Sequence, residues 1–163
     1  MTATKNNPAE TPADRTLVIT RVFDAPRSLV YEAWTKKEHL DRWCAPHGFT
    51  IPESRGDFRI GGKWYSLMIA PDGEKYPVGG VYREIVPNER LVFTHTWEED
   101  DATPEHETLV TIRFADEGAK TRVTFEQSIF RSVESRNNHE SGWSQCFEKL
   151  ETLLAELKTK GKA

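Results

Sequence analysis

The chain of 163 residues contains little cysteine and no long apolar run. Its two cysteines, Cys44 and Cys146, are too few for a disulfide scaffold and fit a reducing cytosol, so we expect a cytoplasmic protein. No stretch approaches the about 18 apolar residues that a membrane helix needs. Residues 1–14 hold one lysine and no apolar segment, which argues against a secretory signal.

Excess positive charge and common catalytic motifs are also missing. Lysine and arginine number 22 against 26 acidic residues, a formal net charge of −4, which argues against nucleic acid as the main partner. The sequence has no nucleophile-elbow motif and no catalytic Cys–His signature. The pairs Gly61-Gly62 and Gly79-Gly80 lack the flanking residues of a phosphate loop, and we expect them to mark bulges or bends in strands.

Aromatic residues are abundant by contrast. Five Trp, four Tyr and eight Phe occur in a chain whose mean hydropathy is −0.65. A chain of this length is about one domain, and it can bury roughly 70% of its unfolded surface. We assign residues 15–160 to a single domain and the polar, proline-containing residues 1–14 to a disordered tail.

The hydrophobic pattern predicts a strand, two short helices and then more strands. Residues 15–23 alternate and are β-branched, as in a strand. Asp24 is the expected cap of a first helix with Pro26 in its first turn, and Thr35 with Glu38 forms a capping-box pattern for a second. An acidic loop at 98–105 is expected to be a solvated hairpin. Further strands are expected at residues 49–53, 58–69, 78–86, 91–97, 108–115 and 121–127.

The C-terminal segment has helical periodicity. Trp143, Phe147, Leu150, Leu154 and Leu157 recur at intervals of three and four, which predicts a long amphipathic helix over residues 133–158. Strands joined by short turns pair antiparallel, and the sheet and the long helix must bury their apolar faces against each other. The predicted fold class is therefore α+β, a curved antiparallel sheet of about six or seven strands around a long C-terminal helix.

An ordered set of motifs in this chain resembles a known family. The set resembles the START/SRPBCC helix-grip superfamily and, within it, the branch similar to the C-terminal domain of the activator of the heat-shock-protein-90 ATPase (Aha-type). The resemblance covers about residues 15–158. The motifs are ITRVFDAPR (19–27), VYEAWT (30–35), WCAP (43–46), FRIGGKW (58–64), YREIVP (82–87), ERL (89–91) and GW (142–143) leading into Leu150 and Leu154.

The resemblance implies a helix-grip (START/Bet v-like) domain with a cavity between the sheet and the C-terminal helix. Such a cavity holds a small hydrophobic or amphipathic molecule, and no cofactor is implied. The superfamily includes lipid carriers, hormone receptors and polyketide cyclases, so the ligand is left open. A protein-interaction module related to chaperone activation is an alternative, and so is a homodimer contact through exposed aromatic residues.

Six residues are candidate ligand contacts because periodicity places them toward the space between sheet and helix. If Phe93 faces inward, period two places His95 and Trp97 there too, and His139 precedes Trp143 by one helical turn. Aromatic walls with a few polar groups are typical of small-molecule pockets, although the same pattern is typical of a filled core. The candidates are Trp64, Tyr82, His95, Trp97, His139 and Trp143; Phe23, Phe114, Phe125 and Phe147 are expected to be ordinary packing.

Catalysis is a weaker alternative, and a metal site is not expected. Period two also places Glu84 on the inner face, so His95 and Glu84 could shuttle a proton on an enolisable ligand, as in a polyketide-cyclase-like enzyme. We expect ligand binding without catalysis. The residues with zinc-ligand chemistry near the second helix match no common zinc spacing; they are His39, Asp41, Cys44 and His47.

Overall fold

The computed structural model describes residues 11–97 and 107–162. The tail predicted at 1–14 therefore lies largely outside the described residues, as does most of the acidic loop predicted at 98–105. The elements in chain order are η3 (Ala13–Arg15), β1 (Leu17–Phe23), α1 (Arg27–Thr35), α2 (Lys37–Trp43), β2 (Thr50–Gly56), β3 (Lys63–Ile69), β4 (Lys75–Val86), β5 (Arg90–Trp97), β6 (Thr108–Glu117), β7 (Lys120–Ser128) and α3 (Val133–Lys162).

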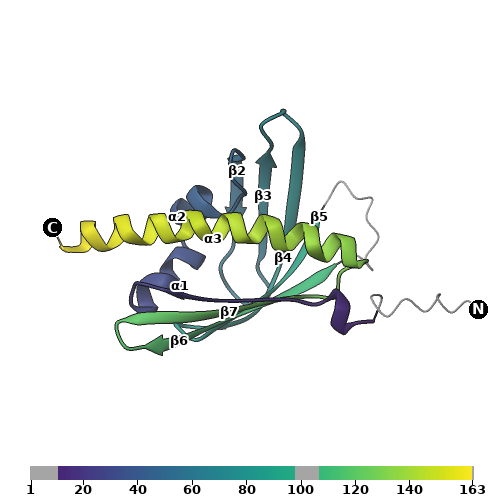
Figure 1. Ribbon diagram of the computed structural model, residues 1–163. Helices are drawn as coiled ribbons and strands as arrows, with labels where there is room; N and C mark the ends of the chain where they lie inside the picture. Colours follow the sequence, from purple (N-terminus) through teal and green to yellow (C-terminus); the bar gives the residue numbers. More distant parts are fainter. Residues whose placement is uncertain (1–10, 98–106, 163) are drawn as a thin grey trace, which may run out of the picture.

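The strands form one antiparallel sheet in the order β1-β7-β6-β5-β4-β3-β2. Consecutive strands from β2 to β7 are neighbours, while β1 closes the far edge against β7. In Figure 1 the strands β2, β3 and β4 rise behind α3, whereas β1, β6 and β7 pass beneath it. The sheet therefore curves around the long helix, and the predicted fold class is confirmed.

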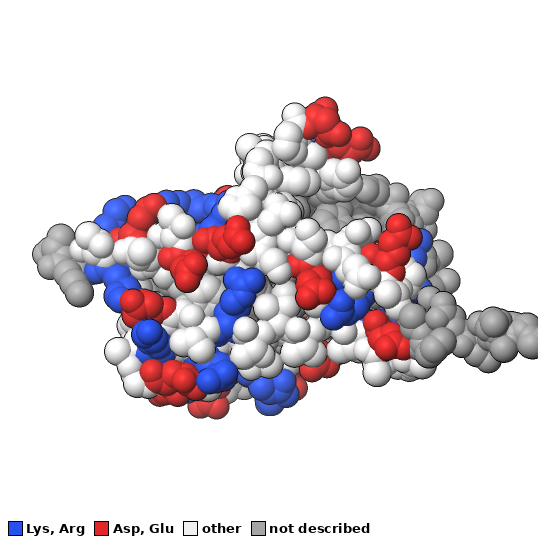
Figure 2. Space-filling model, in the orientation of Figure 1, with Lys and Arg blue, Asp and Glu red and all other residues white. Residues whose placement is uncertain are grey.

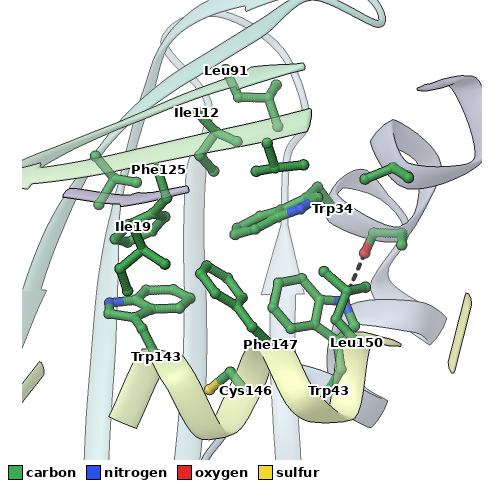
Figure 3. Close-up of a cluster of buried hydrophobic side chains, with 14 of the residues drawn as sticks. Ile19, Trp34, Trp43, Leu91, Ile112, Phe125, Trp143, Cys146, Phe147 and Leu150 are labelled. Atoms are coloured by element: carbon green, nitrogen blue, oxygen red, sulfur yellow. Dashed lines mark hydrogen bonds between the residues drawn. The ribbon is translucent and has the colours of Figure 1, made fainter. Parts of the chain in front are cut away.

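An aromatic core joins the sheet to the helices. Figure 3 shows Trp143, Phe147 and Leu150 of α3 pointing toward the sheet. Phe147 is 1% exposed, and its ring lies 5.6 Å from Phe125 of β7 and 6.0 Å from Trp34 of α1. All four phenylalanines expected to be ordinary packing are buried: Phe23, Phe114, Phe125 and Phe147.

The two short helices carry tryptophans into the same core. Trp34 of α1 and Trp43 of α2 have ring centroids 4.5 Å apart. The indole nitrogen of Trp43 donates to the carbonyl oxygen of Ala33 at 2.9 Å, which fixes the turn between α1 and α2. The short helices thus close one end of the space under the curved sheet.

The predicted helix caps are wrong in detail. Pro26 is the N-cap of α1, and Asp24 lies too far upstream, where its carboxylate pairs with Lys158 at 3.3 Å. Lys36 is the N-cap of α2 without a side-chain hydrogen bond. Thr35 cannot cap α2 because it is the last residue of α1, where its hydroxyl donates to the carbonyl oxygen of Glu32.

The strand ends also differ from the prediction. Strand β3 begins at Lys63 and not at residue 58, since residues 57–62 form a tight turn in which the amide of Gly62 donates to the carbonyl oxygen of Arg59. A Cβ atom at Gly62 would lie 1.9 Å from the carbonyl oxygen of Asp57, so this turn requires glycine. Phe58 and Ile60 are exposed there, and Phe58 becomes part of the cavity entrance described below.

Charge on the surface is mixed in sign. On the face that carries α3, basic and acidic side chains are interspersed (Figure 2). Within the ranges that the structure describes, no helix is long and apolar enough to cross a membrane.

Candidate ligand-binding site

Two adjoining cavities lie between the sheet, the short helices and α3. The first, of about 240 Å³, is bounded by β2 to β5, α1, α2 and the middle of α3. The second, of about 490 Å³, lies between β3 to β5 and the first half of α3. Both cavities are lined by Cys44, Met68, His95 and Trp143, so these four side chains form the boundary between them.

The structure brings the six candidate residues together around His95. Trp64, Tyr82, His95 and Trp143 line the first cavity, and His95, Trp97, His139 and Trp143 line the second. From the His95 ring, centroid distances are 5.3 Å to Trp97, 5.9 Å to Trp64, 6.0 Å to His139 and 6.3 Å to Trp143. Tyr82 joins the group through Phe93, whose ring lies 6.0 Å from Tyr82 and 5.7 Å from Trp64.

His95 reaches this position because β5 alternates. Leu91, Phe93 and His95 all face the interior, and His95 is 5% exposed. Burial lowers the pKa of His95 to about 3, with a smaller contribution from His139 and an opposing one from its own backbone oxygen. His95 is therefore a neutral imidazole near pH 7. No side chain among the described residues hydrogen-bonds with its ring.

His139 is neutral too, but both of its ring nitrogens are occupied. Nε2 accepts a hydrogen bond from the indole nitrogen of Trp97 at 2.9 Å, so Nε2 carries no proton. Nδ1 then holds the proton and donates to the carbonyl oxygen of Ser135, one helical turn earlier, at 2.8 Å. Burial lowers the pKa of His139. This histidine fixes Trp97 in the wall and leaves no ring nitrogen for a ligand.

A buried hydrogen-bond chain fixes Trp143. Its indole nitrogen donates to Oε1 of Gln127 at 2.8 Å, and Nε2 of Gln127 donates to Thr108 at 2.9 Å. The Thr108 hydroxyl donates in turn to the backbone carbonyl of His95 at 3.2 Å. Gln127 is fully buried, and the sequence analysis missed it. The signal was present, because Val123, Phe125 and Gln127 alternate along β7.

Trp64 depends on a glycine in the neighbouring strand. Its indole nitrogen donates to the carbonyl oxygen of Thr94 at 3.2 Å, directly over Gly80 of β4. A Cβ atom at Gly80 would lie 1.9 Å from that oxygen and 2.7 Å from the indole nitrogen. Gly80 thus permits the close approach of the Thr94 carbonyl oxygen and the Trp64 ring to β4. The bulge expected at Gly79-Gly80 lies further along β4, between Tyr82 and Glu84.

Tyr82 is another polar group of the inner wall. It is 8% exposed, and burial raises the pKa of its hydroxyl to about 12, so the phenol stays protonated. Phe58 packs edge-on against the Tyr82 ring at 5.1 Å and is itself 39% exposed. Phe58 therefore separates this end of the first cavity from solvent.

The predicted pair of His95 and Glu84 does not form. A β-bulge between Tyr82 and Glu84 places Tyr82 opposite Phe93 but Glu84 opposite Val92. The bulge turns Glu84 to the outer face, where its carboxylate pairs with Arg90 at 2.9 Å and is half exposed. The proton shuttle built on this pair is therefore wrong.

The charged side chains of the first cavity lie at its rim and are paired. Lys37 contacts Asp41 at 2.8 Å, and Asp41 also accepts a hydrogen bond from Ser54. Arg55 pairs with Glu53 at 2.8 Å and stacks over the Tyr65 ring at 4.3 Å. The side chains of Lys37 and Arg55 are 61% and 66% exposed. The inner wall of the first cavity is thus apolar or neutral.

The residues with zinc-ligand chemistry do not gather. His39 lies 3.7 Å from Glu32, His47 pairs with Glu148 at 2.8 Å, and Asp41 pairs with Lys37 at 2.8 Å. Cys44 lines the cavities, and burial raises the pKa of its thiol to about 12. In the described parts of the chain, no group of three or more His, Cys, Asp or Glu residues could hold a metal ion.

Comparison with known proteins identifies the family. The profile of the family described as activator of Hsp90 ATPase homolog 1-like protein matches residues 24–155. No curated protein matches the chain.

Solved bacterial structures share the fold over nearly their whole length. Protein CV1439 from Chromobacterium violaceum is 27% identical, with a TM-score of 0.80 over 86% of this chain and 96% of that one. Protein NE0264 from Nitrosomonas europaea is 27% identical, with a TM-score of 0.77 over 91% and 99%. The AHSA1 protein from Silicibacter pomeroyi is 26% identical, with a TM-score of 0.77 over 86% and 97%. The chain therefore belongs to the family of activator of Hsp90 ATPase homolog 1-like proteins, within the superfamily that its motifs resemble.

Proposed function

We propose that this protein binds a small apolar or amphipathic molecule in the first cavity, with the second cavity as a way in or as room for a longer ligand. The observation that carries the proposal is the cavity of about 240 Å³ whose inner wall combines aromatic rings with the side chain of His95. Small-molecule sites are concave and mostly apolar, with a few polar groups that orient the ligand. A packed core would instead leave few voids larger than a water molecule.

The wall is also held in place before any ligand arrives. Trp64, Trp97 and Trp143 each donate their indole N–H to another protein group. Because these rings are already ordered, little side-chain entropy is lost on binding.

The test uses a cavity-filling variant. Ser66 of β3 lines the first cavity, so Ser66→Leu should fill it, whereas Ser28→Leu adds the same side chain on the exposed surface of α1. The probe is N-phenylnaphthylamine, an uncharged dye whose emission rises in apolar sites. We expect the wild type and Ser28→Leu to enhance the dye emission and Ser66→Leu to lose most of that enhancement. Equal enhancement in all three proteins would contradict binding in this cavity.

A protein–protein contact is the second candidate, and exposed apolar side chains at one end of the sheet favour it. Val18, Val22, Leu109 and Ile129 are 41–52% exposed at the β1–β7–β6 end of the sheet. The family is named for an activator of the Hsp90 ATPase. A contact with a chaperone of that type should survive Ser66→Leu and should be weakened by Val18→Asp with Val22→Asp, measured by pull-down with purified chaperone.

A further inference from the structure

Two polar rings that line the first cavity have no hydrogen bond to a described side chain: Trp34, whose buried indole nitrogen can only donate, and His95, whose imidazole can also accept. The nitrogens of Trp64, Trp97 and Trp143 already donate to protein acceptors, and both nitrogens of His139 are in use. The imidazole of His95 is 5% exposed and has no hydrogen bond to a described side chain. A buried polar group without a side-chain partner is destabilising, so a ligand that hydrogen-bonds with the His95 imidazole gains affinity.

The hydrogen-bonding capacity of His95 follows from the chemistry of the imidazole ring. The imidazole is neutral, so one nitrogen carries a proton and the other offers a lone pair. A ligand hydroxyl can therefore donate to one ring nitrogen or accept from the other.

The charge that a ligand can carry is limited by the residues that line the two cavities. The charged residues of the first cavity, Lys37, Asp41 and Arg55, lie at the rim and are already paired. The described lining of the second cavity contains no lysine, arginine, aspartate or glutamate. A carboxylate placed against His95 would leave water without a fixed positive charge beside it, which strongly disfavours binding.

Resting on the proposed function, we propose that the ligand is an uncharged apolar molecule with a hydroxyl group, and that this hydroxyl forms a hydrogen bond with the imidazole of His95. A fatty acid or another anion would not place its charged group at this position. The Tyr82 hydroxyl lines the same cavity and can donate to a second oxygen of such a ligand.

The experiment compares three probes that share one ring system. β-Naphthol, β-methylnaphthalene and β-naphthoate differ in a hydroxyl, a methyl and a carboxylate, and near pH 7 the carboxylate alone is charged. Affinities are measured by isothermal titration calorimetry with the wild-type protein, His95→Phe and the surface variant His47→Phe. The ranking in the wild type needs no variant, so the proposal stays testable if His95→Phe does not fold.

We expect β-naphthol to bind about fivefold more tightly than β-methylnaphthalene, the gain of one neutral hydrogen bond. β-Naphthoate should bind at least about tenfold more weakly than β-naphthol. His95→Phe should bind β-methylnaphthalene as well as the wild type and should lose the preference for β-naphthol, whereas His47→Phe keeps it.

Failure of the proposed function and failure of the proposal on His95 would give different results. If none of the three probes binds, the proposed function is contradicted. If they bind but β-naphthoate binds best, if β-naphthol has no advantage, or if the advantage survives in His95→Phe, the function stands and the proposal on His95 is wrong.

Discussion

Acid should destabilise this protein through His95, and the size of the effect can be worked out. The folded protein holds His95 neutral, with a pKa of about 3, whereas an unfolded chain has an ordinary histidine pKa near 6.5. Below about pH 6.5 the unfolded chain therefore binds a proton that the folded protein does not. The stability contribution is complete above pH 6.5 and is lost as the pH falls toward 3.

The expected loss is about 1.4 kcal/mol in the free energy of unfolding for each pH unit below 6.5. Between pH 7 and pH 5 this amounts to roughly 2 kcal/mol from His95 alone. The lowered pKa of His139 adds a loss of the same sign. The assay is urea unfolding at pH 7, 6 and 5, followed by tryptophan fluorescence, for the wild type and His95→Phe.

His95→Phe keeps an aromatic ring on β5 but removes the titrating group. Its stability should fall between pH 7 and pH 5 by about 2 kcal/mol less than that of the wild type, whatever its stability at pH 7. His47→Phe, at an exposed position, is the matched control. Equal losses in the wild type and His95→Phe would refute the assignment of His95 as a buried neutral base.

Three further predictions concern the groups that hold the cavity wall. Gln127→Leu should destabilise the fold by about 1–3 kcal/mol in urea unfolding, because it leaves the buried Trp143 nitrogen without an acceptor; an unchanged unfolding midpoint would contradict the hydrogen-bond chain. Gly80→Ala should lower the melting temperature strongly, whereas Gly142→Ala, whose Cβ would have only an ordinary contact at 3.7 Å, should gain up to about 1 kcal/mol in helix stability. Trp97→Phe should raise the pKa of His139, measured by NMR titration of the ring, because the donor to its neutral Nε2 is lost and solvent gains access; an unchanged titration would show that this contact does not hold the tautomer.

The sequence predicted those features that depend on regular periodicity. Period two along β5 correctly placed Phe93 and His95 on one face, and the helical spacing of Trp143 and Phe147 identified the buried face of α3. It failed at Glu84, because one extra residue in a bulge reverses the facing of the rest of the strand and leaves no mark in the alternation. The prediction of the first helix cap also failed because of local backbone geometry. Asp24 is a residue type that often caps helices, but α1 begins only at Arg27, so Asp24 lies upstream of the N-cap position.

The cavity itself could not be predicted from the pattern. Whether aromatic rings fill a space or line it depends on how far the strands curve and on where each ring is held. Here Trp64 and the Thr94 carbonyl oxygen approach β4 closely because residue 80 is glycine, and the ring positions rely on partners outside the aromatic set, such as Gln127 and Ser135. The spacing of aromatic residues contains neither piece of information.

The arrangement of hydrogen bonds divides the polar groups of the cavity into two kinds. The nitrogens of Trp64, Trp97, Trp143 and His139 are satisfied within the protein, so these rings present only their carbon surfaces to a ligand. Such surfaces attract apolar molecules of many shapes and discriminate weakly between them, since one methylene group changes the free energy by only about 1 kcal/mol. Discrimination must then come from the polar groups that are left over. Those include the imidazole of His95, the hydroxyl of Tyr82 and the indole N–H of Trp34, all buried and all neutral, so ligands should be selected by the position of an uncharged oxygen more than by the size of the apolar part.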